Sequence, residues 1–292
     1  MIKNFVQSFL FSKLPVRGAY VELTDVWQTI SAQKDYPQGV KQVLGELLAA
    51  NVLITSNLKF NGKIIVQIQD NPKLDIIVSE CSNNLNVRAT AKFSKNILNN
   101  EYKDIIATGN LVISIDSNSD GKIYQSVISL SSYSISELLD KYMLQSEQLR
   151  SVCVIAYTEN KIVGFILQQL PEQIDLFTDE LLKVFLLAQT LTHDELLTKD
   201  LTKILKNLFY EDDITVFNPR EVEFSCTCSQ NKVTDMLKGL GKKEAQSIIE
   251  EIGEVKVTCE FCNMNYTYNI QDIENIFNSQ SIDVGVLSKE IH

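Results

Sequence analysis

The sequence has little of what marks secreted, disulfide-bonded or membrane proteins. Its 292 residues include 6 cysteines, too few for a disulfide scaffold in a chain of this length. No stretch approaches the roughly 18 consecutive apolar residues of a membrane helix. The N-terminal segment has neither a sustained apolar run nor the small-residue cleavage site of a secretion signal. We therefore expect a cytoplasmic protein without a membrane partner, in which thiols stay reduced.

Motifs for nucleotide binding and for hydrolysis are also missing. No Gly-x-Gly-x-x-Gly or Walker-type loop occurs in the sequence. Of the two histidines, His193 lies in a helix-capping pattern and His292 is the last residue, so neither is placed by the sequence to act as a base for a cysteine nucleophile. We predict no catalytic residue, and we expect that the protein is not an enzyme.

Positive charge is scarce. The chain has 27 Lys and Arg against 37 Asp and Glu, a formal net charge of -10, and a field of that sign repels phosphate backbones. Nucleic acid is therefore not expected as a partner. Four lysines near the C-terminal cysteines keep a locally basic surface open as an alternative: Lys232, Lys238, Lys242 and Lys243.

Two close pairs of cysteines stand near the C-terminal end. Cys226 and Cys228 form a Cys-x-Cys, and Cys259 and Cys262 form a Cys-x-x-Cys. Each pair can turn two sulfur atoms toward one point, and four thiolates at about 2.3 Å complete a closed tetrahedral zinc site. The single residue inside the first pair and the long spacer between the pairs differ from a zinc ribbon. We predict that these four residues, called the cysteine cluster below, hold one zinc ion.

The first 175 residues read as a sheet domain with a few helices. A helix after Pro37 is expected to end near Asn51, where β-branched residues weaken it, and Ser134 with Glu137 has the spacing of a capping box that opens another helix. Cys81 and Cys153 fall inside apolar strand-like runs and are expected to be buried, inert thiols. Sheet with segregated helices favours an α+β fold over a doubly wound nucleotide fold. The strand-like runs are 15–23, 63–69, 74–80, 86–91, 111–115, 124–130, 152–157 and 162–170.

A strongly amphipathic helical segment follows, which we assign to a linker over 176–222. It has one apolar helix after Phe177 and a second that opens with the capping box of Thr192 and Glu195 and runs to Phe209. An apolar stripe this rich must be covered by the first domain, by the cysteine module or by a partner. The simplest interpretation is ordinary core packing of a connecting helix pair.

The third expected part is the cysteine module, 223–292. Two short helices that end at Gly241 and Gly253 separate the cysteine pairs, the second pair lies in a turn between two strands, and a final helix follows. The module has few apolar positions, and domains below about 70 to 80 residues usually need a disulfide, a bound metal or a similar cross-link in addition to their hydrophobic core. The metal is therefore expected to be part of what folds it.

These motifs resemble the heat shock protein 33 family, the bacterial redox-regulated chaperones. The resemblance rests on Phe224 to Ser229 and Cys259 to Asn263, and extends over nearly the whole chain through Val16 to Gly18 and Gln145 to Leu149, among other stretches. It implies an N-terminal substrate-binding domain, a linker folded over it and a zinc-holding C-terminal switch. It further implies an ATP-independent holdase that is inactive when reduced, is activated under oxidative stress, binds unfolding proteins and forms homodimers on activation.

Elementary energetics favours such a switch in the cysteine cluster. A structural zinc site contributes an apparent 10 to 16 kcal/mol, roughly, against about 5 to 15 kcal/mol of total stability for an average domain. Thiolates are also the species that oxidants attack. A disulfide within either pair closes a loop of only a few residues and is worth at most about 2 kcal/mol, so it does not replace the tie across the spacer. The two cysteines of a pair have a high effective concentration for each other, whereas a cross-pair bond needs the spacer to stay folded while the metal leaves. Oxidation is therefore expected to form within-pair disulfides, and the family resemblance implies that Cys259 and Cys262 react first.

Two other functions stay open. A dithiol oxidoreductase would use Cys259 and Cys262, but a thioredoxin-type pair opens a helix after a strand, whereas this pair is expected in a turn between strands. A zinc-stabilised module that binds nucleic acid or a partner is disfavoured by the net charge.

Overall fold

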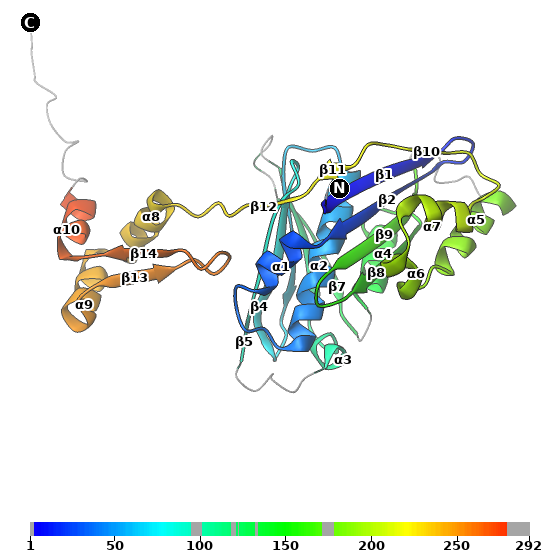
Figure 1. The fold of residues 1–292 in the computed structure, drawn as a ribbon. Helices are drawn as coiled ribbons and strands as arrows, with labels where there is room; N and C mark the ends of the chain where they lie inside the picture. The colour runs from blue at the N-terminus through cyan, green and yellow to red at the C-terminus, as the bar shows by residue number, and fades with distance from the viewer. Residues whose placement is uncertain are drawn as a thin grey trace, which may run out of the picture. The chain divides into compact units, whose positions relative to one another are not determined.

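The structure, a computed structural model, describes residues 3–94, 101–117, 121, 123–131, 134–170 and 178–278. The chain divides into two compact units, Met1–Ser225 and Cys226–His292, and each is described by itself. Sheets dominate the first unit, and the second is a small mixture of helices and a hairpin (Figure 1). The α+β class predicted from the sequence is confirmed.

The first sheet of unit 1 has the strand order β10-β1-β2-β9-β8, and β11 pairs with β1 beside β10. All its pairs are antiparallel. Strands from the start of the chain therefore lie between strands from residues 151–221. The bounds are β1 (Asn4–Phe11), β2 (Val16–Leu23), β8 (Ser151–Tyr157), β9 (Ile162–Gln169), β10 (Ile214–Val216) and β11 (Arg220–Glu221).

The second sheet has the order β12-β5-β4-β3-β6-β7. Its pairs are antiparallel except that β12 runs parallel to β5. The strands between 62 and 129 agree with the predicted runs to within a few residues. Their bounds are β3 (Gly62–Gln69), β4 (Leu74–Ser82), β5 (Asn86–Phe93), β6 (Asn110–Ser117), β7 (Ile123–Ser129) and β12 (Glu223–Phe224).

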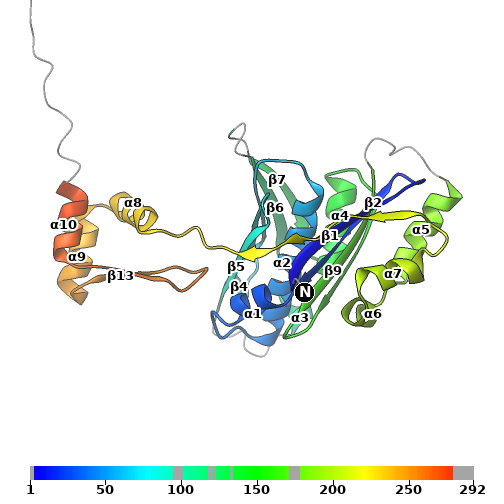
Figure 2. The ribbon, with the colours of Figure 1, turned by 45° about the horizontal axis from the view of Figure 1, so that its top comes forward.

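Helix α2 (Gln38–Asn57) lies between the two sheets, as both ribbon views show (Figures 1 and 2). The prediction that it ends near Asn51 is wrong, because Val52 and Ile54 are buried in the main core and packing overrides their weak helix propensity. Asn51 is itself buried and donates to the carbonyls of two strands. Shorter helices complete this layer: α1 (Asp25–Ser31), α3 (Tyr102–Ile105) and α4 (Ile135–Gln145), which begins with the predicted capping box.

The linker helices lie on the outer face of the first sheet (Figure 2). They are three rather than the predicted pair: α5 (Asp179–Gln189), α6 (His193–Thr198) and α7 (Leu201–Leu208). The break falls at Asp200, whose side chain accepts a hydrogen bond from the Lys203 N–H and so caps α7. The capping box at Thr192 is confirmed. Residue 177, the expected start of this segment, lies outside the described residues.

The apolar stripe of the linker is buried against the first unit. Leu181, Phe185 and Leu205 share a core with Phe9 and Phe165 of the sheet. Of the three possible covers, the first domain is therefore the one that buries the stripe. No helix among the described residues combines the length and the apolar character needed to cross a membrane.

Unit 2 has the helices and hairpin predicted for it. Among its described residues, the core holds seven buried side chains, with Leu237, Ile249 and Tyr268 among them. Helices α8 and α9 end at Gly241 and Gly253, both with positive φ. The bounds are α8 (Gln230–Leu240), α9 (Lys242–Ile252), β13 (Val255–Thr258), β14 (Asn265–Tyr268) and α10 (Ile270–Asn278).

Candidate metal centre

The structure gathers the four residues of the cysteine cluster at one point of unit 2. The sulfur atoms of Cys226, Cys228, Cys259 and Cys262 all lie within 4.8 Å of one another. The Sγ atoms of Cys226 and Cys259 are 3.6 Å apart, and those of Cys228 and Cys262 are 3.4 Å apart. Among the described residues, this is the one group of His, Cys, Asp and Glu side chains close enough to hold a metal ion.

Local structure places the second pair. Cys259 follows β13, its N–H donates to the Met264 carbonyl at 2.9 Å, and its own carbonyl accepts from the Asn263 N–H at 2.9 Å. Asn263 has φ 55°, a left-handed conformation that Asn tolerates better than most residues. The tight turn brings Cys262 back toward Cys259. The pair thus lies in a turn between two strands, unlike a thioredoxin-type pair at the start of a helix.

The first pair lies in the extended segment between β12 and α8. Ser229 caps α8 by accepting from the Lys232 N–H, and the Lys232 ammonium donates to the Thr227 carbonyl at 2.8 Å. These contacts fix the segment that holds Cys226 and Cys228 against the start of the helix. The first pair is thereby held in place beside the second.

The four sulfur atoms fit a tetrahedral metal ion. Four thiolates at about 2.3 Å from a central ion stand about 3.8 Å from one another, and the two cross-pair separations of 3.6 and 3.4 Å are close to that value. Burial raises the pKa of the Cys262 thiol above its usual range, and the neighbouring thiols raise it further. A divalent cation supplies the charge that four crowded thiolates need. The cluster can therefore hold a metal ion, and its donor set is the one that zinc prefers.

Tyr266 adds a contact that was not assigned from the sequence. Its hydroxyl donates to Cys228 Sγ at 3.2 Å. Tyr266 and Tyr268 are two positions apart on β14, so they lie on the same face of the strand. Tyr268 is buried in the core of unit 2. This two-residue spacing was the available signal that Tyr266 points inward too.

The two remaining cysteines are far from such chemistry. Cys81 and Cys153 are free and buried in the main core of unit 1, as predicted. Burial raises the pKa of Cys81 to about 12 and that of Cys153 well above its usual range. Both are therefore protonated and unreactive near neutral pH. His193 is exposed at the start of α6, and His292 lies outside the described residues.

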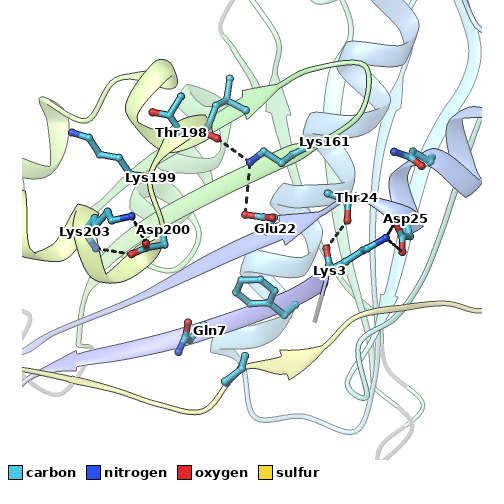
Figure 3. Close-up of a pocket in the computed structure, with 14 residues that line it drawn as sticks. Lys3, Gln7, Glu22, Thr24, Asp25, Lys161, Thr198, Lys199, Asp200 and Lys203 are labelled. Carbon is cyan, nitrogen blue, oxygen red and sulfur yellow. Dashed lines mark hydrogen bonds and ion pairs between the residues drawn. The ribbon is translucent and has the colours of Figure 1, made fainter. Parts of the chain in front are cut away.

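Polar contacts also hold the linker at the edge of a hollow of about 880 Å³. Figure 3 shows Lys161, just before β9, reaching toward α6, where its ammonium donates to the Leu197 carbonyl at 2.9 Å. The same nitrogen lies 3.9 Å from the Glu22 carboxylate. Lys203, in contrast, pairs with Asp200 of its own helix. Lys161 thus ties the last turn of α6 to the first sheet.

Comparison with known protein families gives one consistent match. The family described as Hsp33 protein matches residues 4–269. The 33 kDa chaperonin of Neisseria meningitidis serogroup A is 38% identical over 280 residues, which are 95% of this chain and 92% of that protein. The 33 kDa chaperonin of Methylobacillus flagellatus is 34% identical over 286 residues, 97% of this chain and 98% of the relative.

Among solved structures, the 33 kDa chaperonin of Thermotoga maritima, a heat shock protein 33 homologue, has the same fold. It superimposes with a TM-score of 0.81 at 21% identity, over 96% of this chain and 99% of the other. The agreement extends over both units of the chain.

Proposed function

Since the chain belongs to the heat shock protein 33 family, whose members named above are chaperonins rather than enzymes, we propose that it is a redox-regulated, ATP-independent holdase. Its reduced form holds one zinc ion and is inactive, and its oxidised form binds unfolding proteins and prevents their aggregation. A reducing compartment such as the cytoplasm keeps it in the first state until oxidative stress. The observation that carries this proposal is the gathering of four sulfur atoms in a unit with a very small core.

Cys226, Cys228, Cys259 and Cys262 are the proposed ligands of zinc and also the redox-active residues. The ion would tie the two ends of the spacer helices together and add stability that seven buried side chains do not supply alone. Tyr266 would orient Cys228 through its hydrogen bond.

Oxidation is the proposed trigger. In each pair two thiolates give up two electrons to peroxide, one S–S bond forms, and the peroxide takes up two protons and leaves as two molecules of water. A disulfide sulfur is a poor metal ligand, so zinc is released. A bridge within each pair leaves the spacer untied, and unit 2 loses its ordered fold.

The linker is the proposed element that converts this change into activity. The chain passes from α7 through the short strands β10, β11 and β12, which pair with β1 and β5, into Cys226. Unfolding of unit 2 would remove the folded unit that follows these strands, and their few pairs would then have to open to free this end of the segment. The linker helices bury the outer face of the first sheet. Their release would expose apolar surface on both the helices and the sheet, which is the kind of surface that binds non-native chains. Homodimers of the oxidised form are proposed on the family resemblance.

One experiment tests the redox cycle directly. Zinc content and free thiols are measured before and after peroxide, together with suppression of aggregation of a chemically unfolded test protein. We expect one zinc and six thiols in the reduced chain, and no zinc with two thiols in the active, oxidised chain. Cys259→Ser should lower zinc occupancy, whereas the matched variants Cys81→Ser and Cys153→Ser should not. Full, tight zinc in Cys259→Ser, or an oxidised chain that never suppresses aggregation, would contradict the proposal.

A further inference from the structure

Strand β7 is the last strand of the second sheet, and no other strand of the described residues pairs with its outer edge. It pairs with β6 on one side and ends the strand order on the other. Every second residue therefore directs its N–H and C=O away from the sheet, and no contact for these groups is found among the described residues. An edge of this kind is a template for another strand.

Large apolar side chains are exposed on both faces of this strand. Ile123 and Val127 share one face and are 64% and 59% exposed, and Tyr124 on the other face is 57% exposed. Apolar side chains of this size, three within five residues of an edge strand, are the pattern that promotes strand addition.

The usual devices against edge pairing are missing from β7. Its residues Ile123–Ser129 include no charged residue, proline or glycine, and its register with β6 runs without a bulge. The other sheet ends differ. The edge of β5 is partly paired by β12, and the end strand β8 of the first sheet is buried over Val152 to Ala156. At the other end of the first sheet, β10 and β11 are only 3 and 2 residues long. Natural proteins usually protect edges in one of these ways, so the exposure of β7 points to a use.

We propose that β7 binds an extended, uncharged, apolar segment of a non-native polypeptide, which adds to the second sheet as a further strand. The choice of occupant rests on the proposed holdase function. Backbone hydrogen bonds make such a site tolerant of sequence, while Ile123, Tyr124 and Val127 favour apolar residues at alternate positions. A chaperone that meets many unfolded chains needs this kind of recognition.

A second copy of the chain fits the edge less well. A seam of seven residues is roughly 23 Å long and 10 Å wide, or on the order of 230 Å² per copy. Stable interfaces bury at least about 1,200 Å² in total. A single flexible strand does not need a large matched surface.

The edge is exposed in the folded chain, so the site is open in the reduced and in the oxidised state. One strand alone binds weakly. On oxidation, surface released from the linker binds a second segment of the same client, and the two contacts together raise the affinity through effective concentration. The redox switch then controls the second contact and leaves the first unchanged.

Two labelled heptapeptides of alternating Val and Thr test the inference with full-length protein. In the one-edge peptide, alternate amides are N-methylated, which blocks self-association and leaves one hydrogen-bonding edge. In the no-edge peptide, both sets of amides are N-methylated and the side chains are unchanged. We expect the one-edge peptide to bind reduced and oxidised protein with Kd values within threefold, and the no-edge peptide to bind at least tenfold more weakly. Equal binding of both peptides, or no binding of the one-edge peptide, would overturn the proposal.

Variants locate the site. Val127→Lys places a charge on the edge and should weaken binding of the one-edge peptide at least fivefold. Leu144→Lys is the matched control, because Leu144 is 65% exposed and lies on α4 instead of on an edge. An equal loss in both variants would show that general apolar exposure, and not the edge, binds the peptide. If Val127→Lys instead turned a dimer into a monomer in sedimentation, the occupant would be a second copy and the proposal wrong.

The same samples separate this inference from the redox function. If oxidised protein suppresses aggregation and Val127→Lys suppresses it equally, without any loss of peptide binding, the edge is not a client site and the redox function stands. If peptide binding follows the edge as expected but oxidised protein does not suppress aggregation, the inference on β7 stands and the redox function fails.

Discussion

Replacing Lys161 by methionine should loosen the linker without touching the cysteine cluster. The Lys161 ammonium donates to the carbonyl of Leu197 in the last turn of α6. A hydrogen bond to a charged group is worth about 1.5 to 3 kcal/mol. The side chain is 29% exposed, and water can replace part of the lost contact, so we expect a cost of about 1 to 2 kcal/mol. Methionine keeps the apolar stem of the side chain, so the loss is that of the charge and its hydrogen bond.

Hydrogen exchange of the reduced, zinc-bound protein measures this cost. A loss of about 1 to 2 kcal/mol raises the opening equilibrium of α6 and α7 roughly 5- to 30-fold, and their amides should exchange faster by that factor. Lys203→Met is the matched control, since Lys203 is 69% exposed and forms an ion pair with Asp200, the N-cap of its own helix. Zinc content should be unchanged in both variants. Equal exchange of α6 and α7 in the two variants would refute the role given to Lys161.

Three further predictions concern the linker, the disulfides and the pH dependence. Leu205→Asn places a polar side chain in the core under α7 and should give measurable suppression of aggregation while the protein is reduced, whereas Leu186→Asn, at a position 53% exposed, should not. In peptide maps of fully oxidised protein, we expect within-pair disulfides, although the shortest sulfur separations in the folded unit are across the pairs; mainly cross-pair disulfides would mean that unit 2 stays folded while it is oxidised. Burial raises the pKa of Glu46 to about 7 in the folded chain, so its protonated form favours folding: this contribution is fully present below about pH 4.5 and is lost as the pH rises through 7. Urea unfolding of unit 1 should therefore show up to about 3 kcal/mol less stability at pH 8 than at pH 4.5 from this group, and a pH dependence that is unchanged in Glu46→Gln would contradict the assignment.

Most of the local structure was predictable because its signals are local. The capping boxes at Ser134 and Thr192 and the glycines after α8 and α9 ended or began helices where the sequence indicated. The cysteine cluster was predictable for the same reason. With only one or two residues between the cysteines of a pair, both sulfur atoms of the pair lie close together. The spacer then needs only to fold back to bring the two pairs into contact.

Features that depend on distant parts of the chain were not predictable. The end of α2 was placed too early, because its β-branched residues weaken an isolated helix but fill the core between two sheets. The sequence predicts a helix pair for the linker, because the apolar stripe continues across Asp200. The structure has a third helix, because the Asp200 side chain caps a new helix at this point. The parallel pairing of β12 with β5 joins residues about 137 positions apart, and the contact of Lys161 with Leu197 has no sequence signature.

The division of the chain also goes beyond sequence patterns. Contacts divide it at Ser225 into two units, and the described part of the segment 176–222 packs within the first. The three-part functional division into 1–175, 176–222 and 223–292 remains our proposal. It separates a client-binding domain, a releasable linker and a redox switch by what each is expected to do.

A time course after peroxide tests the central claim, that loss of zinc unfolds unit 2 and releases the linker. Zinc release, hydrogen exchange and suppression of aggregation are followed in one sample of full-length protein. We predict that zinc leaves first, that α8 to α10 and the β13–β14 hairpin then lose protection together with α5 to α7, and that the strands of the second sheet keep theirs as suppression appears. Full suppression of aggregation while α5 to α7 stay protected would contradict the account.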